Sequence, residues 1–252
     1  MRFIFYFVAT GVIVIFVALL AARLIFFQDR NLPPILDFQR IHLYKNPTTV
    51  VENVRVFAFY AVPSDRAEAI YPGWRDLLFE ALQRLSRFHE IQFVGKSHIQ
   101  YDVFPEPIIL DDEGGAYDAA SPLDEHHVGL RRAFEEFERE LTDPAGNDKV
   151  RKFLGTSRDQ YRTLVFLYEG AGAYGKEGLA AISRRALTDS RYSAFGDSWL
   201  YHQFAHALGL PDQQDSTTGL ATSDDIMGLG RHRPLDLNYI APELTRGMGL
   251  VE

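Results

Sequence analysis

Hydrophobic residues along the chain recur with periods that predict alternating strands and helices. A run rich in β-branched and aromatic residues from Val54 to Val62 stops at Pro63 and predicts a strand. After Pro72, apolar residues return every three or four positions and predict a helix with one buried face, formed by Trp74, Leu77, Leu78, Ala81, Leu82, Leu85 and Phe88. The same spacing predicts a second helix that ends before Asp143-Pro144, with Leu130, Ala133, Phe134, Phe137 and Leu141 on its apolar face.

Further apolar runs predict strands at Val103–Leu110, Thr163–Tyr168 and Leu179–Ser183. Between the last two, Gly170–Gly175 matches the spacing G-x-G-x-x-G, but a dinucleotide site also needs a helix to begin there. No helical pattern begins at that point, so we interpret the segment as a glycine-rich connection. Strands that alternate with helices predict an α/β or α+β domain.

The amino-terminal segment predicts a membrane helix. Phe3–Ala22 contains 20 consecutive uncharged residues, enough for a helix to cross a hydrocarbon core of about 30 Å. A cleaved signal peptide is the rival interpretation, but Leu24–Phe27 resumes the apolar run beyond the small residues Ala21-Ala22. We therefore predict a single transmembrane anchor over residues 1–27. Arg2 lies on one side and Arg23 on the other, so charge does not fix the orientation.

The rest of the chain divides into a tether and one domain. Residues 28–50 show no sustained period and contain Pro33-Pro34 and Asn46-Pro47, which is typical of a linker. Residues 51–252 then form the predicted soluble domain. The net charge is −8, which argues against a nucleic-acid partner. The chain has no cysteine, so any metal site must use histidine and carboxylate ligands.

The segment His202–Asp212 carries the candidate chemistry. His202 and His206 are four residues apart, so on a helix both imidazoles lie on one face and can reach one ion. Gly209 can end the helix in the left-handed conformation, and the turn can bring Asp212 back as a third ligand. Three protein ligands and an open fourth position are usual for catalytic zinc.

Together with the downstream Asp225-Ile226-Met227-Gly228, this segment resembles the metzincin zinc metalloproteases, whose motif HExxHxxGxxH or HExxHxxGxxD precedes a Met-turn. The resemblance implies a zincin domain with a mixed sheet, an active-site helix and Zn²⁺ held by His202, His206 and Asp212. It also implies that Met227 packs beneath the metal, and that Pro242–Gly247 lies in a carboxy-terminal helix.

The chain departs from this pattern at Gln203, which stands where the family has the catalytic glutamate. A carboxamide cannot accept a proton from water at neutral pH, and loss of a general base costs roughly 10²–10⁴-fold in rate. Another carboxylate, such as Glu169 or Asp225, would have to approach the metal to replace it.

Two hypotheses remain open. The first is a membrane-anchored pseudoprotease that acts as a binding or structural subunit of a membrane complex, with or without zinc. The alternative is an active zinc endopeptidase with a peptide substrate, in which an unusual base serves or Gln203 was introduced in place of a native Glu. The family resemblance implies an extracytoplasmic domain, periplasmic or extracellular.

Overall fold

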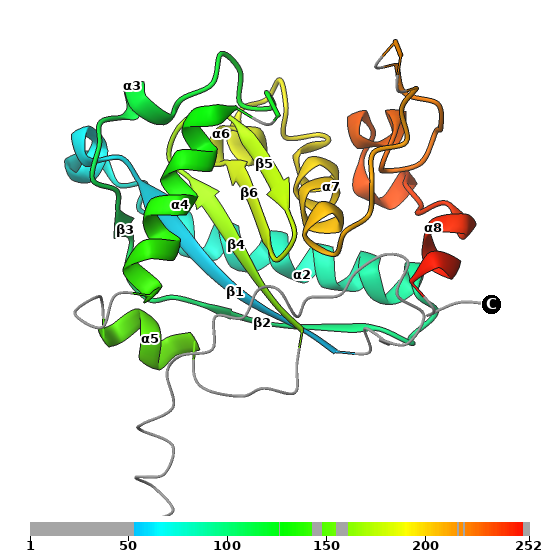
Figure 1. Cartoon of the computed structure of the whole chain (residues 1–252), viewed down its shortest axis with the longest axis horizontal. Coiled ribbons are helices and arrows are strands. Elements are labelled where there is room, and N and C mark those ends of the chain that lie inside the picture. The colour runs from blue at the N-terminus through cyan, green and yellow to red at the C-terminus, as the bar shows by residue number, and fades with distance from the viewer. Residues whose placement is uncertain are drawn as a thin grey trace, which may run out of the picture.

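The computed structural model describes residues 53–125, 127–142, 148–154, 161–215, 217–218 and 220–248. Their centre is a six-stranded sheet in the order β2-β1-β4-β6-β5, with the short β3 also pairing with β1 (Figure 1). The strands are β1 (Asn53–Val62), β2 (His98–Val103), β3 (Ile108–Ile109), β4 (Tyr161–Tyr168), β5 (Ala173–Lys176) and β6 (Leu179–Ser183). All pairs are parallel except β5 with β6, so the predicted mixed sheet is confirmed.

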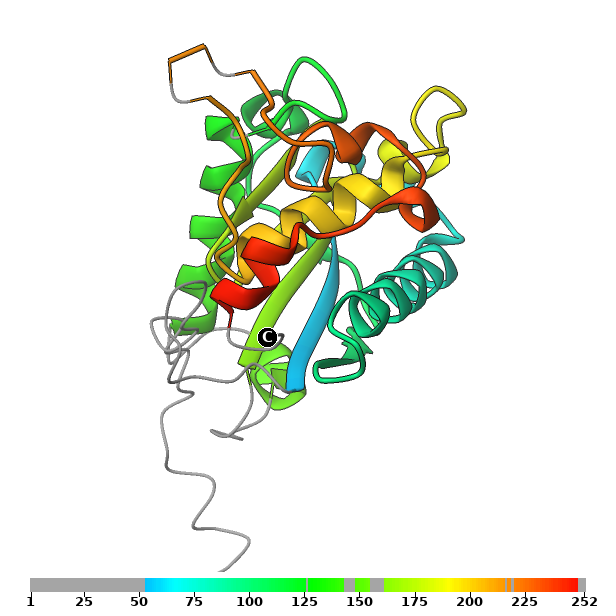
Figure 2. The ribbon, with the colours of Figure 1, turned by 90° about the vertical axis from the view of Figure 1, so that its right-hand side faces the viewer.

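Helices cover both faces of the sheet. They are α2 (Trp74–Gln92), α3 (Gly114–Tyr117), α4 (Val128–Thr142), α5 (Asp148–Leu154), α6 (Arg184–Thr188), α7 (Gly196–Ala207) and α8 (Pro242–Gly247), with 3-10 turns η2 (Ser64–Ala69), η3 (Leu229–His232) and η4 (Leu235–Leu237). Figure 2 shows α2 and α4 on opposite sides of the strands. The helices predicted from Trp74, Leu130 and Pro242 are thus confirmed.

Each face of the sheet has its own hydrophobic core, because successive side chains of a strand point to opposite faces. Val54, Val56 and Tyr60 of β1 pack in the core that includes α2 and α7. Phe57 and Phe59 of the same strand pack in the core that includes α4 and α5. A strand buried on both faces is typical of a parallel sheet, and this burial explains the nearly continuous apolar run from Val54 to Val62.

Two predicted elements are corrected by the structure. The strand expected at Val103–Leu110 is divided between β2 and β3, because Pro105 and Pro107 lack the N–H group that would continue the ladder. The glycine-rich connection after β4 contains β5, an edge strand that pairs with β6 through Ala173–Lys176. This segment is a turn and a strand, so no helix begins there to hold a pyrophosphate.

The predicted anchor at 1–27 and tether at 28–50 lie outside the described residues. Among the residues that the structure does describe, no helix is both long and apolar enough to cross a membrane.

Candidate metal centre

Helix α7 carries both histidines of the motif. Ten of its twelve residues are buried, and it packs against β5 and β6. His202 and His206 are one helical turn apart, and their Nε2 atoms are 3.2 Å from each other. The spacing that predicted a shared ion therefore does bring the two imidazoles together.

Gly209 ends the helix and directs the chain back toward the histidines. Its φ is +81°, a conformation in which glycine avoids a Cβ clash. The Gly209 N–H donates to the His206 carbonyl at 2.8 Å and the Leu210 N–H to the Ala205 carbonyl at 2.9 Å, which is the Schellman arrangement. After this turn the Asp212 Oδ1 lies 3.4 Å from the His206 Nε2 and 3.5 Å from the His202 Nε2. The predicted return of Asp212 is what the structure shows.

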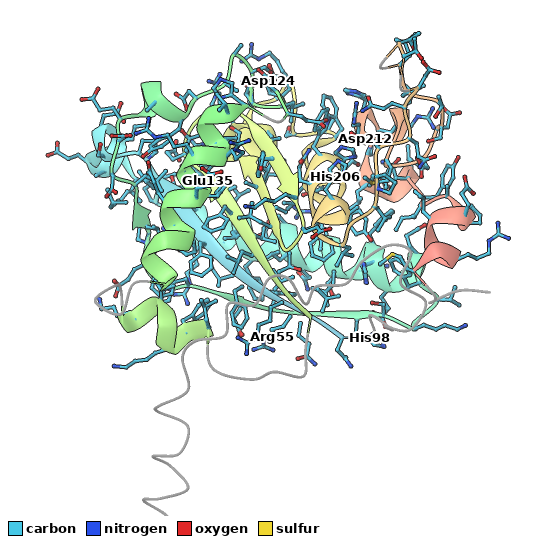
Figure 3. All side chains as sticks on the ribbon, in the orientation of Figure 1. Arg55, His98, Asp124, Glu135, His206 and Asp212 are labelled. Atoms are coloured by element: carbon cyan, nitrogen blue, oxygen red, sulfur yellow. The ribbon has the colours of Figure 1, made fainter. Side chains whose placement is uncertain are left out.

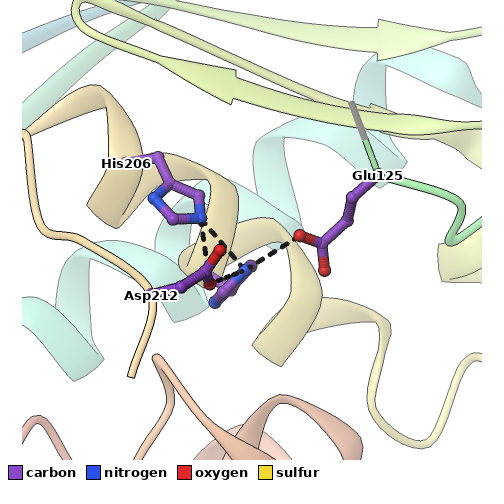
Figure 4. A group of neighbouring side chains, drawn as sticks. Glu125, His206 and Asp212 are labelled. Carbon is purple, nitrogen blue, oxygen red and sulfur yellow. Dashed lines mark hydrogen bonds and ion pairs between the residues drawn. The ribbon is translucent and has the colours of Figure 1, made fainter. Parts of the chain in front are cut away.

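Sequence reasoning missed a fourth member of this group, Glu125. It precedes α4, and its Oε2 lies 3.5 Å from the His202 Nε2. Its segment is held to the edge of the sheet, because the Ala173 N–H donates to the Asp124 carbonyl at 2.9 Å and Glu125 forms a parallel bridge with Ala173. Figure 4 shows Glu125 reaching the group from the side away from His206 and Asp212. One ligand atom from each of the four residues lies within 4.8 Å of all the others, so the group could hold a metal ion.

Hydrogen bonds set the orientation of both imidazole rings. The His202 Nδ1 lies 3.0 Å from the Ile226 carbonyl oxygen, and the His206 Nδ1 lies 2.8 Å from that of Leu210. A carbonyl oxygen only accepts, so each Nδ1 carries a hydrogen and each ring directs its Nε2 into the group. Metal-binding histidines commonly have such a partner on the other nitrogen.

The separations fit a tetrahedral ion. Ligand atoms about 2.0–2.1 Å from zinc in tetrahedral geometry are about 3.3–3.4 Å apart. His202, His206 and Asp212 form a triangle with sides of 3.2, 3.4 and 3.5 Å, close to one face of that tetrahedron. Nitrogen and carboxylate donors also suit zinc, so the residues present fit the metal that the motif predicts.

Local charges keep the carboxylates ionised. Burial opposes ionisation of Asp212, but its neighbours His206, His202 and Arg231 outweigh burial and lower its pKa to about 2. Burial also opposes ionisation of Glu125, but His202 and Arg231 outweigh the effect of burial and lower the pKa of Glu125. Burial lowers the pKa of His202 despite the opposing effect of Glu125. At neutral pH the group therefore offers anionic oxygens and an unprotonated His202, the forms that bind metal.

The predicted Met-turn lies directly against this group. Its Ile226 carbonyl orients His202, and the Met227 carbonyl accepts from the Gln213 N–H at 2.9 Å, beside Asp212. The Met227 side chain is fully buried in the core that includes α7. Asp225 stabilises the turn by accepting from the Ala241 N–H at 3.0 Å and the Ser223 hydroxyl at 2.5 Å.

Gln203 is fully buried, and neither atom of its amide has a hydrogen-bond partner among the described residues. It lies against β5, where a Cβ added to Gly175 would approach the Gln203 Oε1 to 2.8 Å. The two carboxylates that sequence analysis considered as replacement bases are engaged elsewhere. Glu169 pairs with Arg184 at 2.6 Å, and Asp225 belongs to the turn. Glu125 is the carboxylate that joins the histidines.

Arg231 of η3 was also missed, and it brings a positive charge into the group. Its Nη1 lies 3.2 Å from the His202 Nε2 and 3.3 Å from oxygens of Asp212 and Glu125. The sequence offered weak signals for both missed residues: a run of acids and histidines, Asp124–His127, and a basic run, Arg231–Arg233. Neither run has a spacing that indicates contact with α7. Figure 3 shows Asp124 just beyond one end of the sheet, the end that is nearer to His206 and Asp212.

Comparison with known proteins finds similarity only among solved structures. No protein-family model matches the chain, and no curated protein matches it. Archaemetzincin from Methanopyrus kandleri is 12% identical with a TM-score of 0.39, and the match covers 80% of this chain and 96% of that one. A zinc-dependent peptidase from Methanocorpusculum labreanum is 17% identical with a TM-score of 0.38, over 77% of this chain and 99% of that one.

Proposed function

We propose that this chain is a metal-binding, metallopeptidase-like domain that does not hydrolyse peptides and serves as a binding or structural subunit of a membrane complex. The observation that carries the proposal is the position of Glu125. Its Oε2 is as far from the His202 Nε2 as the Asp212 Oδ1 is, 3.5 Å, and within 4.8 Å of the other ligand atoms, so we take Glu125 as the fourth ligand. Zinc sites with four protein ligands are typically structural, whereas catalytic sites keep one position open.

Gln203 supports the same conclusion on a separate chemical ground. Zinc in an open site acts as a Lewis acid and lowers the pKa of water. Peptide hydrolysis also needs a group that takes a proton and delivers it to the leaving nitrogen. The Gln203 amide cannot do this, and it is buried against Gly175. In this proposal His202, His206, Asp212 and Glu125 hold the ion, and Gln203 fills space between α7 and β5.

The membrane part of the proposal depends on Phe3–Ala22, the 20-residue uncharged run. An anchor of this length followed by a domain without a proton-transfer group at residue 203 suits a protein that holds a partner at a membrane. We propose an extracytoplasmic position for the domain, by the family resemblance described above.

An active zinc endopeptidase is the second candidate, and Glu125 is also the observation that favours it. Glu125 is a carboxylate with a lowered pKa beside the histidines, so at neutral pH it could serve as a base. A glutamine introduced at position 203 in place of a native Glu would be a different route to the same enzyme.

Metal analysis and peptidase assays of the full chain separate these candidates. We expect about one zinc per chain, loss of zinc in His206→Ala, and no hydrolysis of a mixed fluorogenic peptide library. Gln203→Glu should also remain inactive, because Glu125 still fills the fourth position. The proposal is wrong if the unmodified protein cleaves peptides, chelation stops cleavage, and Glu125→Gln abolishes it while zinc is retained. Cleavage that appears only in Gln203→Glu would instead indicate a replaced native glutamate.

A further inference from the structure

The guanidinium of Arg231 is part of the candidate metal centre, although arginine is not a metal ligand. Its Nη1 contacts His202 at 3.2 Å and both Asp212 and Glu125 at 3.3 Å. Its Cζ also lies 5.1 Å from the centre of the Trp199 ring, on the same helix as the histidines. Three of the four proposed ligands are thus already in contact with one cation.

The distances place this guanidinium close to any metal ion that the same ligands would hold. The His202 Nε2 and the Asp212 Oδ1 are 3.5 Å apart, and the Arg231 Nη1 is 3.2 and 3.3 Å from them. Zinc about 2.0–2.1 Å from both ligand atoms would lie within about 4 Å of Nη1, whichever side it occupied. A dication and a guanidinium at that separation in a largely buried site repel each other strongly.

From this geometry we propose that Arg231 and the metal ion compete for the same ligands. Without metal, Arg231 pairs with Asp212 and Glu125; on metal binding, its side chain leaves the group. The Arg231 side chain is 19% exposed and belongs to the short turn η3, so it can move toward solvent while α7 stays in place. This inference rests on the proposed metal-binding function and adds its regulation: the affinity for metal is set by a cation that the chain itself supplies.

If Arg231 and the metal compete, removing the Arg231 charge should destabilise the metal-free protein and strengthen zinc binding. Arg231→Gln should lower the melting temperature of the metal-free protein, because two carboxylates then face each other without a cation. The same substitution should tighten zinc binding at least tenfold, because zinc no longer displaces a guanidinium. The zinc-induced rise in melting temperature should grow accordingly, since a ligand that binds only the native state stabilises it in proportion to the logarithm of its affinity.

The test uses the purified full chain and competition for zinc against a chromophoric chelator, together with melting curves with and without zinc. Arg233→Gln is the matched control, because Arg233 is two residues away and its side chain pairs with the exposed Asp224. It should leave the affinity for zinc unchanged. Arg231→Met removes the same charge and should behave like Arg231→Gln if that variant fails to fold. Arg231→Lys keeps a cation and should stay close to the unmodified affinity.

The outcomes distinguish this inference from the proposed function. If the unmodified chain binds zinc through His206 and the affinity of Arg231→Gln and Arg231→Met is unchanged or weaker, competition is wrong and the metal-binding function stands. If neither the unmodified chain nor either variant takes up zinc, both are wrong. If the variants bind zinc and the unmodified chain does not, competition is supported, and the native state of the group is the metal-free one.

Discussion

Gly175 of β5 lies close against the helix that carries the histidines, and Gly175→Ala tests whether this closeness is required. The new Cβ would lie 2.7 Å from the Gln203 carbonyl oxygen and 2.8 Å from both the Gln203 Oε1 and the His206 Cβ, whereas ordinary contacts are 3.4–4 Å. The Gln203 amide can rotate away, but the carbonyl and the Cβ belong to α7. Helix and strand must therefore separate by several tenths of an ångström.

The magnitude follows from the cost of overpacking. An extra methyl group in a well-packed core typically costs about 1–3 kcal/mol, while replacing glycine lowers unfolded-state entropy and returns about 0.4–1 kcal/mol. We expect a net loss of about 1–2 kcal/mol in the free energy of unfolding. For a domain of this size that corresponds to a fall of roughly 2–8 °C in melting temperature. Because His206 must move with the helix, zinc affinity should fall as well.

Chemical denaturation of the full chain measures this loss, and Gly115→Ala is the matched control. Gly115 lies in α3, is exposed, and a Cβ added there meets nothing within 4 Å. The control should leave stability unchanged or slightly raised. If Gly175→Ala is as stable as Gly115→Ala and binds zinc as tightly as the unmodified chain, then α7 does not approach β5 as closely as the structure shows.

Three further predictions concern other parts of the chain. Burial of the His89 ring lowers its pKa to about 3, so the native state resists protonation. The contribution of His89 to the free energy of unfolding should be complete above pH 6.5 and be lost between pH 6.5 and 3, on the order of 5 kcal/mol in all; His89→Gln should weaken the pH dependence of denaturation across that range. Asp225→Ala removes the acceptor for the Ala241 N–H and should cost about 1–3 kcal/mol in the same assay, with weakened zinc uptake because the Ile226 carbonyl that orients His202 moves. Phe3–Ala22 should keep the full chain in the membrane fraction after a carbonate wash at high pH, and release into the supernatant would contradict the anchor.

Local periodicity predicted those helices and strands in which buried apolar residues recur at a regular spacing. The apolar stripe of α2 and the buried runs of β4 and β6 repeat at helix and strand periods, and each lies close to its expected position. Strand β5 was missed because Ala173–Lys176 contains a glycine and follows two others, a composition typical of a turn. Its place in the sheet comes from pairing with β6, which no local pattern reveals.

The residues of the candidate site likewise fall into those that local geometry brings together and those that tertiary contacts bring in. His202 and His206 are related by one helical turn, and Asp212 by the turn at Gly209, so short-range geometry was enough to bring these three together. Glu125 and Arg231 arrive from separate segments. Glu125 is positioned by the pairing of its segment with Ala173, and Arg231 by the turn that follows Met227. Contacts of this kind depend on tertiary structure and could not be inferred from spacing.

In the proposed function, Glu125, Arg231 and Gln203 each oppose hydrolysis in a different physical way. In that proposal Glu125 takes the position that water would need, and Arg231 competes with the metal for its ligands. Gln203 removes the proton acceptor, and its neutrality suits its surroundings, since a fully buried carboxylate without a partner is costly. The two carboxylates and one guanidinium together contribute a net charge of −1, and a glutamate at position 203 would make this −2 in a buried space. With zinc bound and Arg231 displaced, Glu125 would still fill the fourth position, so we expect that a single substitution at Gln203 is not sufficient to make this site a peptidase.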